Sequence, residues 1–339
     1  RLMAATVCGS ALMLAACGES PKEDVATTDS TSDSARNGTC TGTYPSYWQD
    51  PAFQDQWVGQ KTSNVPPADW TGPVYQLSDD FPRSPVDDAA SQQWRDSKFD
   101  ALFDEGTSQE EKAKLAYDYG WLVMKYIQEG NVNQKDAEDW DVCNNKVRPW
   151  YNIPFQTYDA MSGREFTHGL TREAPVTFST PEGDMPSTMW AVGFFNATAA
   201  YTLGTVWQAD GTAKIPQDDV SFDEGAVIGK PLFNTLSPDV LPVMANLPSW
   251  NANISDPTFC SCKPANGKEC TLIEESEQCP RSTTEWGDVT LLQFDFAVKD
   301  SRAKGTEWVF GTFVADGQRK ADVDDPWLRI ALLGVMWGN

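Results

Sequence analysis

Histidine and basic side chains are scarce in this sequence. Its 339 residues hold one histidine, and 26 lysine and arginine residues stand against 49 aspartate and glutamate residues, for a formal net charge of −23. A chain this acidic repels phosphate backbones, so we expect no nucleic-acid partner, and charge alone does not favour an anionic lipid surface. A single histidine excludes sites built on several histidines, so a metal site would need carboxylates or thiolates.

Long hydrophobic runs are also absent, because no stretch reaches the roughly 18 apolar residues of a membrane-spanning helix. The apolar run LMAATVCGSALML at residues 2–14 is too short to span a bilayer but has the length of a signal-peptide core. It ends in the sequence LAACG, which resembles the lipobox of bacterial lipoproteins. We therefore predict a signal peptide at residues 1–16, cleavage before Cys17 and acylation of Cys17. The alternative is an ordinary signal peptide followed by a chance cysteine.

The residues after Cys17 have almost no apolar side chains. Between residues 18 and 39 only Val25, Ala26 and Ala35 are apolar, too few to offset the entropy cost of ordering the chain. We predict a disordered tether at residues 17–45. Anchor and tether together predict an exported protein held by its lipid at the bacterial cell envelope, at the outer membrane or facing the periplasm. The membrane is then a partner through Cys17.

The remaining cysteines fit an oxidising compartment. Of eight cysteines, Cys8 leaves with the signal peptide and Cys17 is acylated, so six remain as disulfide candidates: Cys40, Cys143, Cys260, Cys262, Cys270 and Cys279. Four of them crowd into residues 260–279, which predicts a disulfide-stapled insertion, with a four-thiolate metal site as the alternative. If these four pair among themselves, Cys40 pairs with Cys143. Sequence alone leaves about 15 connectivities open.

The body divides into a helical and irregular aromatic-rich region at residues 46–149 and a β-rich body at residues 150–339. In the first region we predict helices near residues 90–104 and 109–129. Apolar side chains recur in the second of these at spacings of three and four residues. Ser108 and Glu111 form a capping-box pattern at its start, and Gly130 ends it.

After Pro149 the apolar period changes to two. Leu292, Phe294, Phe296 and Val298 alternate with more polar residues, which indicates a half-buried strand. A second strand is predicted at residues 306–315. Further candidates are residues 188–196, 199–208, 225–234 and 327–337. This pattern predicts an α+β fold whose C-terminal part is an antiparallel β-sandwich or open barrel.

Side chains suited to chemistry gather between Arg148 and Glu173. His168 has an unperturbed pKa near neutrality, so we predict it as an acid or base together with Glu165 and Glu173. The ligand-binding candidates are Arg164 and Arg172, which can hold a carboxylate or phosphate, and Trp150 and Tyr151, which can serve as stacking platforms.

A purely structural role for the same residues is the competing interpretation. If this segment is an extended strand, Arg164 and His168 lie on one face and Glu165 on the other, and arginine–glutamate pairs can pin such a strand inside a sandwich. The sequence contains no G-x-S-x-G, P-loop, dinucleotide-binding or H-E-x-x-H pattern. Its acidic clusters do not match an EF-hand loop. We predict no cofactor and no metal site.

Several ordered phrases resemble a family of uncharacterised exported bacterial proteins, some of which carry the label "cytochrome c family". The resemblance covers roughly residues 65–339, and its phrases include VPPADWTGPVYQLSDDFP, RPWYNIPF, GREFTHGLTRE, AVGFFNATAAYTLGTVW, LLQFDFAVKDSRA, WVFGTFVADG and LLGVMWGN. FDEGAVIGKPLF and WVFGTFVADG are also similar, more weakly, to β-rich cytochromes whose haem is crosslinked to a lysine. The chain has no C-x-x-C-H motif for covalent haem attachment.

These observations lead to three functional hypotheses. The first is a non-enzymatic, lipid-anchored protein that binds a ligand or protein partner at the cell envelope. One form of this hypothesis places the protein next to a redox system. The second is a hydrolase or lyase acting on extracellular polymers, in which His168 works with Glu165 or Glu173. The third is non-covalent haem or metal binding through the segment that contains His168.

Overall fold

A computed structural model of the chain describes residues 80–131, 142, 145–152, 165, 168–180, 183–208, 214, 216, 219–252, 254 and 287–337. Tertiary contacts divide the chain into two compact units, Arg1–Ala35 and Arg36–Asn339, and every described residue belongs to the second. The predicted signal peptide, Cys17, the tether, the six disulfide candidates and the 260–279 insertion lie outside the described residues. Among the residues described, no helix has the length and apolar character needed to cross a membrane.

The helical region begins with three short 3-10 turns and ends with one long helix. The elements are η2 (Ala89–Ser91), η3 (Gln93–Arg95), η4 (Ser97–Phe99), α2 (Asp100–Phe103) and α3 (Gln109–Gln128). The prediction of a helix at 109–129 is confirmed to within one residue. Ser108 caps it by accepting a hydrogen bond from the Glu111 backbone N–H at 3.2 Å. Gly130 follows it with a φ of 80°, a conformation that glycine adopts without strain.

The described strands form a single antiparallel sheet, which confirms the predicted α+β class with an antiparallel, open sheet. They are β1 (Trp150–Tyr151), β2 (Thr171–Thr180), β3 (Gly183–Ala191), β4 (Phe194–Asn196), β5 (Val227–Asn234), β6 (Ser249–Ala252), β7 (Gly287–Lys299), β8 (Trp308–Ala315) and β9 (Ile330–Met336). The remaining elements are α4 (Ala197–Val206), η6 (Pro242–Met244) and η7 (Pro326–Leu328).

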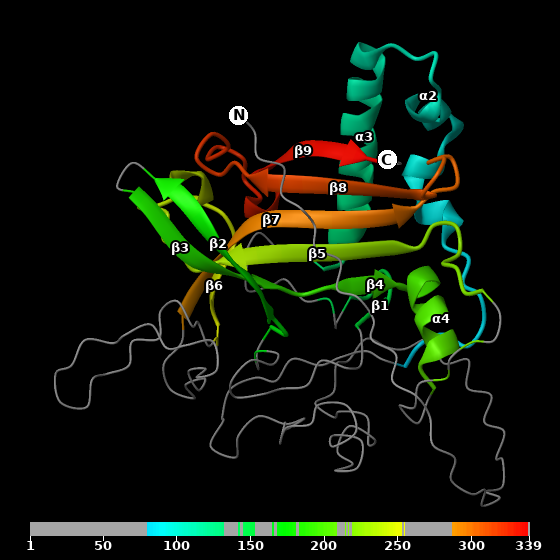
Figure 1. Ribbon diagram of the computed structural model, residues 1–339, viewed down its shortest axis with the longest axis horizontal. Coiled ribbons are helices and arrows are strands. Elements are labelled where there is room, and N and C mark those ends of the chain that lie inside the picture. The colour runs from blue at the N-terminus through cyan, green and yellow to red at the C-terminus, as the bar shows by residue number, and fades with distance from the viewer. Residues whose placement is uncertain are drawn as a thin grey trace, which may run out of the picture. The chain divides into compact units, whose positions relative to one another are not determined.

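The long strand β7 organises the sheet. It pairs with β5 along one edge, and its other edge pairs with β6 at one end and β8 at the other. β3 and β4 pair with successive parts of β5, β1 pairs with β4, and β9 continues the sheet from β8. The hairpin of β2 and β3 extends from the sheet at the end opposite α4 (Figure 1).

Two of the strand predictions need correction. Residues 199–208 are not a strand but mainly helix α4, which Asn196 caps by accepting a hydrogen bond from the Ala199 backbone N–H at 2.9 Å. The predicted strand 188–196 is interrupted at Val192 and Gly193, between β3 and β4. Strand β2 was not predicted, because its charged residues and Pro175 hide the alternation.

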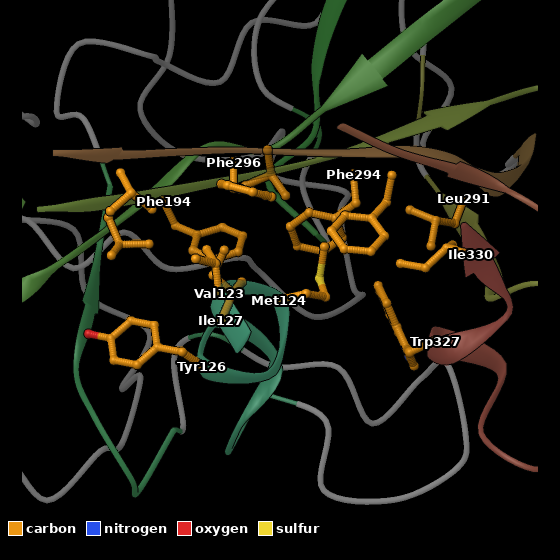
Figure 2. Packing of buried hydrophobic residues seen from close by; sticks show 14 of the residues in the cluster. Val123, Met124, Tyr126, Ile127, Phe194, Leu291, Phe294, Phe296, Trp327 and Ile330 are labelled. Carbon is orange, nitrogen blue, oxygen red and sulfur yellow. The ribbon is translucent and has the colours of Figure 1, made fainter. Parts of the chain in front are cut away.

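The core lies between α3 and one face of the sheet. Figure 2 shows Val123, Met124 and Ile127 of α3 pointing toward Phe294 and Phe296 of β7. The alternation of Phe294, Phe296 and Val298 is confirmed, since all three are buried. A bulge at Leu292 changes the register, so Leu291 takes the fully buried position and Leu292 is half-buried.

Candidate functional site

Glu165 lies at the base of a turn that leads into β2. Its side chain is fully buried, and its Oε1 accepts hydrogen bonds from the backbone N–H groups of His168 and, at 3.4 Å, of Leu170. The Glu165 N–H donates to the Leu170 carbonyl at 2.7 Å, and Gly169 has a φ of 74°. The carboxylate therefore replaces a backbone acceptor and fixes the backbone at His168 and Leu170.

The His168 imidazole lies between this carboxylate and an aromatic stack. Its ring is parallel to the Trp250 ring, with centroids 4.6 Å apart and an interplanar angle of 22°. The centroid of the Trp250 ring lies 4.4 Å from that of Phe233 and 6.2 Å from that of Trp327, so the stack reaches into the core. The imidazole is thereby held against a rigid surface.

The two nitrogens of His168 have different surroundings. Nδ1 is buried and lies 3.4 Å from Oε1 of Glu165, while the side chain as a whole keeps 21% of its surface exposed. Nδ1 makes no hydrogen bond within the described residues, and a proton placed on it would face the Glu165 carboxylate and leave Nε2 as an acceptor. This arrangement suits either hydrogen bonding to a ligand or proton transfer.

The predicted placement of Glu165 and His168 on opposite faces of a strand is wrong. His168 lies in a turn and Glu165 precedes the first residue of β2, Thr171, so the turn brings the two side chains together. Arg164 lies outside the described residues. Arg172 is half-buried in β2, paired in register with Trp190 of β3.

Glu173 belongs to a second group of charged side chains, which we call the sheet-face cluster: Glu173, Lys230 and Asp295. The Lys230 Nζ lies 2.8 Å from the Glu173 carboxylate, and Lys230 and Asp295 are register partners on β5 and β7. Asp295 alternates with the buried Phe294 and Phe296, so the cluster lies on the face of the sheet opposite the core packed on α3.

Asp295 is the most perturbed acid of this cluster. Burial raises the pKa of its carboxyl above 3.8, and the charge of Glu173 acts in the same direction. Hydrogen bonds from Gln293 at 2.7 Å and Thr312 at 2.8 Å, together with the charge of Lys230, counteract part of this effect on the pKa. Such a carboxyl keeps its proton to a higher pH than an exposed aspartate does.

The predicted stacking platforms are core residues. Trp150 is 3% exposed and meets Phe194 edge-on at 4.9 Å, and Tyr151 is 7% exposed and packs against Phe81. A stacking platform needs an exposed ring face, and both rings are too buried to offer one to a ligand.

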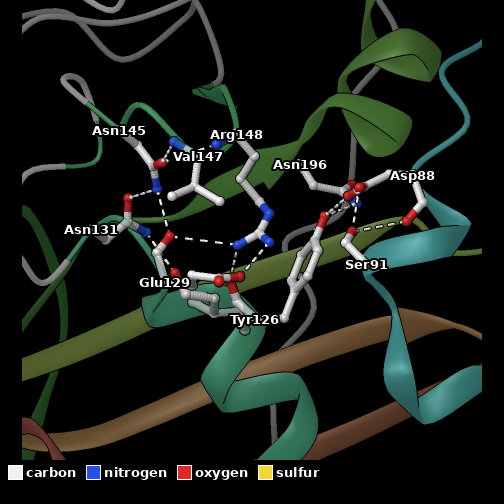
Figure 3. A network of polar contacts seen from close by, with 10 residues as sticks. Asp88, Ser91, Tyr126, Glu129, Asn131, Asn145, Val147, Arg148 and Asn196 are labelled. Carbon is white, nitrogen blue, oxygen red and sulfur yellow. Dashed lines mark hydrogen bonds and ion pairs between the residues drawn. The ribbon is translucent and has the colours of Figure 1, made fainter.

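Arg148 is likewise committed to the structure. Its guanidinium lies 3.9 Å from the centroid of the Tyr126 ring and 2.7 Å from the Glu129 carboxylate (Figure 3). The Tyr126 hydroxyl donates to Asp88 and accepts from Asn196 at 3.1 Å. Burial, with the nearby Asp88 charge, raises the pKa of Tyr126. This network ties the end of α3 to the sheet and to the 3-10 turns.

Sequence reasoning missed the partners rather than the titratable groups. It selected Glu165, His168 and Glu173 by residue type, but Trp250 and Lys230 come from distant segments with no local signal. Asp295 did carry a signal, because it is an acidic residue within an otherwise half-buried alternating strand. Within the described residues, no three His, Cys, Asp or Glu side chains are grouped so as to hold a metal ion.

No family model, curated protein or solved structure matches this chain. The resemblance to exported proteins labelled "cytochrome c family" thus stays a prediction from the sequence.

Proposed function

We propose that this protein is anchored by a lipid at the bacterial cell envelope and binds a ligand or protein partner there. The single observation that carries the binding proposal is the His168 imidazole, fixed between Glu165 and Trp250 with part of its surface exposed. A polar side chain that is already held in one orientation can form a directed hydrogen bond to a ligand and loses little conformational entropy when the ligand binds.

The anchoring part of the proposal depends on the LAAC sequence that ends at Cys17. We expect full-length protein produced in a bacterial host to fractionate with membranes and to gain the mass of acyl chains. Cys17→Ser should release the protein from the membrane fraction, whereas Cys8→Ser should leave it membrane-bound. Membrane retention of the Cys17→Ser protein would contradict lipid anchoring at this residue.

The binding part has an unusually selective probe, because His168 is the only histidine of the chain. In protein labelled with ¹³C and ¹⁵N histidine, the imidazole gives one set of resonances. We expect the free protein to show the Nδ1-protonated tautomer. Peptidoglycan fragments, neutral and acidic oligosaccharides, and envelope proteins would then be added separately, and a binder should shift the Nε2 and Cε1 signals saturably.

His168→Ala provides the matched test of that result. A ligand found by the resonance shift should lose at least about tenfold in affinity for this variant, since one directed hydrogen bond is lost. Unchanged affinity, or the absence of any saturable shift across the three classes, would contradict a ligand role for His168.

The contact between Glu165 and His168 also favours a second function, the cleavage of extracellular polymers by a hydrolase or a lyase with His168 as general base. In that case turnover of a polymer should disappear in His168→Ala and show a pH profile set by the imidazole. His168→Gln separates the two functions. The glutamine amide retains hydrogen-bonding capacity for a ligand but cannot act as a base. If the protein is a binder, His168→Gln should keep its affinity and the parent should show no turnover, and that result would exclude the enzyme. If it is an enzyme, the parent should turn over the polymer and His168→Gln should not.

A further inference from the structure

A pocket of about 430 Å³ opens between the 3-10 turns and α3. Its wall includes the apolar side chains of Ala89 and Leu122 and five polar or charged side chains, which are Gln92, Gln93, Arg95, Asp96 and Lys98. The volume falls in the range of small-molecule sites. None of these residues belongs to the His168 site or to the sheet-face cluster, so the pocket is a separate feature.

The pocket is locally basic in a chain whose net charge is −23. Arg95 and Lys98 contribute two positive charges against the single negative charge of Asp96. Arg95 is half-buried, and its guanidinium makes no hydrogen bond or ion pair with any residue in the described part of the chain. A partly desolvated guanidinium with no protein partner is satisfied best by an anionic group, which it can hold with two parallel hydrogen bonds.

Gln92 is a fixed part of the pocket wall. The side chain is 2% exposed, and its Nε2 donates to the Gly225 carbonyl at 2.8 Å. Its Oε1 lies against Gly225, where a Cβ would clash with it, so the amide holds the turn to the segment before β5 and does not itself face a ligand.

The backbone that carries these side chains is held in place before any ligand arrives. Arg302 donates to the carbonyls of Trp94 at 2.8 Å and Asp96 at 3.2 Å, on either side of Arg95. Trp94 and Phe99 are 1% and 0% exposed and fix the same segment to the core. Pre-organisation of this kind lowers the entropy cost of binding.

We propose that this pocket binds a small hydroxylated monocarboxylate, of which a hexuronate sugar is the model. Arg95 and Lys98 hold the carboxylate. Gln93 and the second carboxylate oxygen of Asp96 serve the hydroxyl groups, and Leu122 packs against the C–H face of the ring. A phosphate dianion fits this pocket less well, because it would meet the Asp96 carboxylate and the negative field of the whole protein. The proposal does not depend on the role of His168.

Titration calorimetry of the mature full-length chain at pH 7 and low salt tests the proposal. The probes are glucuronate, glucose and glucose 6-phosphate. We expect glucuronate to bind saturably, and the neutral and the phosphorylated sugar to bind at least roughly tenfold more weakly. Arg95→Gln and Lys98→Gln should each weaken glucuronate binding by about the same factor.

Lys114→Gln is the matched control, since it removes the same charge from an exposed position on α3 that does not line the pocket. Its affinity for glucuronate should equal that of the parent, and so should that of His168→Ala. Circular dichroism confirms that each variant is folded, and the exposed position of Lys98 keeps its substitution harmless to the core.

Three results would overturn the proposal. The first is the absence of saturable glucuronate binding by folded parent protein. The second is tighter binding of the phosphorylated sugar, which would replace the ligand class. The third is an equal loss of affinity in Lys114→Gln or in His168→Ala, which would assign the effect to general charge or to the His168 site.

Discussion

Glu165, Arg148 and Arg302 have one property in common: each of these charges, buried in the first two and half-buried in Arg302, holds backbone or a second charge. Glu165 accepts from backbone N–H groups, Arg148 pairs with Glu129, and Arg302 pairs with Asp300 at 2.8 Å. Tyr119 donates to the same Asp300 at 2.9 Å, and burial together with that carboxylate raises the pKa of Tyr119. His168 differs from all of them because its buried Nδ1 makes no hydrogen bond within the described residues.

Glu165→Ala should lower the free energy of unfolding by about 1–3 kcal/mol, because the backbone N–H groups of His168 and Leu170 lose their acceptor. Glu165→Gln keeps an acceptor oxygen and should cost less. Urea unfolding at pH 7 measures both differences. Glu105→Ala is the control, since Glu105 is exposed. Equal effects of the two alanine substitutions would mean that the buried carboxylate does not support the turn.

Asp295→Asn should change how stability depends on pH. The raised pKa of Asp295 means that the folded protein keeps this proton to a higher pH than the unfolded chain does. Between 3.8 and the raised pKa the unfolded state therefore binds fewer protons, so the parent loses stability as the pH rises. The variant does not titrate here, so its melting temperature minus that of the parent should increase as the pH rises through this window and stay level above it.

The control for that experiment is Asp239→Asn, which removes one negative charge from an exposed position. It corrects for the relief of general repulsion in a chain with a net charge of −23. A constant difference between Asp295→Asn and Asp239→Asn across pH 3 to pH 7 would show that the Asp295 pKa is not raised by folding.

At the scale of single elements, local signals account for what the sequence predicted well. The helix α3 has its own cap, its own apolar periodicity and a terminal glycine, and the β7 strand alternates on its own, so neither prediction required a partner. α4 has a local cap in Asn196, but its aromatic and β-branched residues, Tyr201, Thr202 and Val206, favour a strand, so it was missed. The Asn196 side chain also accepts from the Val227 backbone N–H at 2.9 Å, a contact between distant segments that no local pattern reveals.

The candidate site shows the same limit. The sequence identified Glu165 and His168 through residue type and proximity along the chain. It could not supply Trp250, because ring stacking between β6 and the turn before β2 exists only after the sheet has formed. It also could not place Glu173 beside Lys230 rather than His168, since a bulge in β2 between Arg172 and Pro175 sets that geometry.

Ser108→Ala should destabilise α3 by about 1 kcal/mol, because the Glu111 backbone N–H loses the cap acceptor at 3.2 Å. Thermal or urea unfolding measures this loss. Thr107→Ala removes a hydroxyl one residue earlier, where no capping bond is formed, and should cost less. If the two substitutions are equally costly, the Ser108 side chain contributes nothing specific as a cap.

At the scale of the whole folded unit, one apolar core joins the helical region to the sheet. The core cluster contains Tyr119, Val123 and Ile127 of α3 together with Phe294 and Phe296 of β7. Arg302 adds polar connections from the turn after β7 to the 3-10 turns and to Asp100 at 3.0 Å. The helix also packs against η4 and α2, where Phe99 and Phe103 meet Tyr119 edge-on, but these elements are too short to be stable alone, so its stability depends on the sheet.

Ile127→Ala should therefore destabilise α3 and the sheet together. Ile127 is fully buried, and its Cγ2 lies 3.2 Å from the point where a Cβ on Gly229 of β5 would stand. The lost contacts and the cavity should cost about 2–5 kcal/mol. Native-state hydrogen exchange should report an equal loss of protection for the amides of α3 and β7, and far-ultraviolet circular dichroism and tryptophan fluorescence should give one coincident transition.

Leu333→Ala, a truncation at a side chain that is 70% exposed, should change neither region appreciably. Protection lost in α3 but retained in β7 would mean that the helical region unfolds separately, and the shared core would then be a docking contact between two folding units.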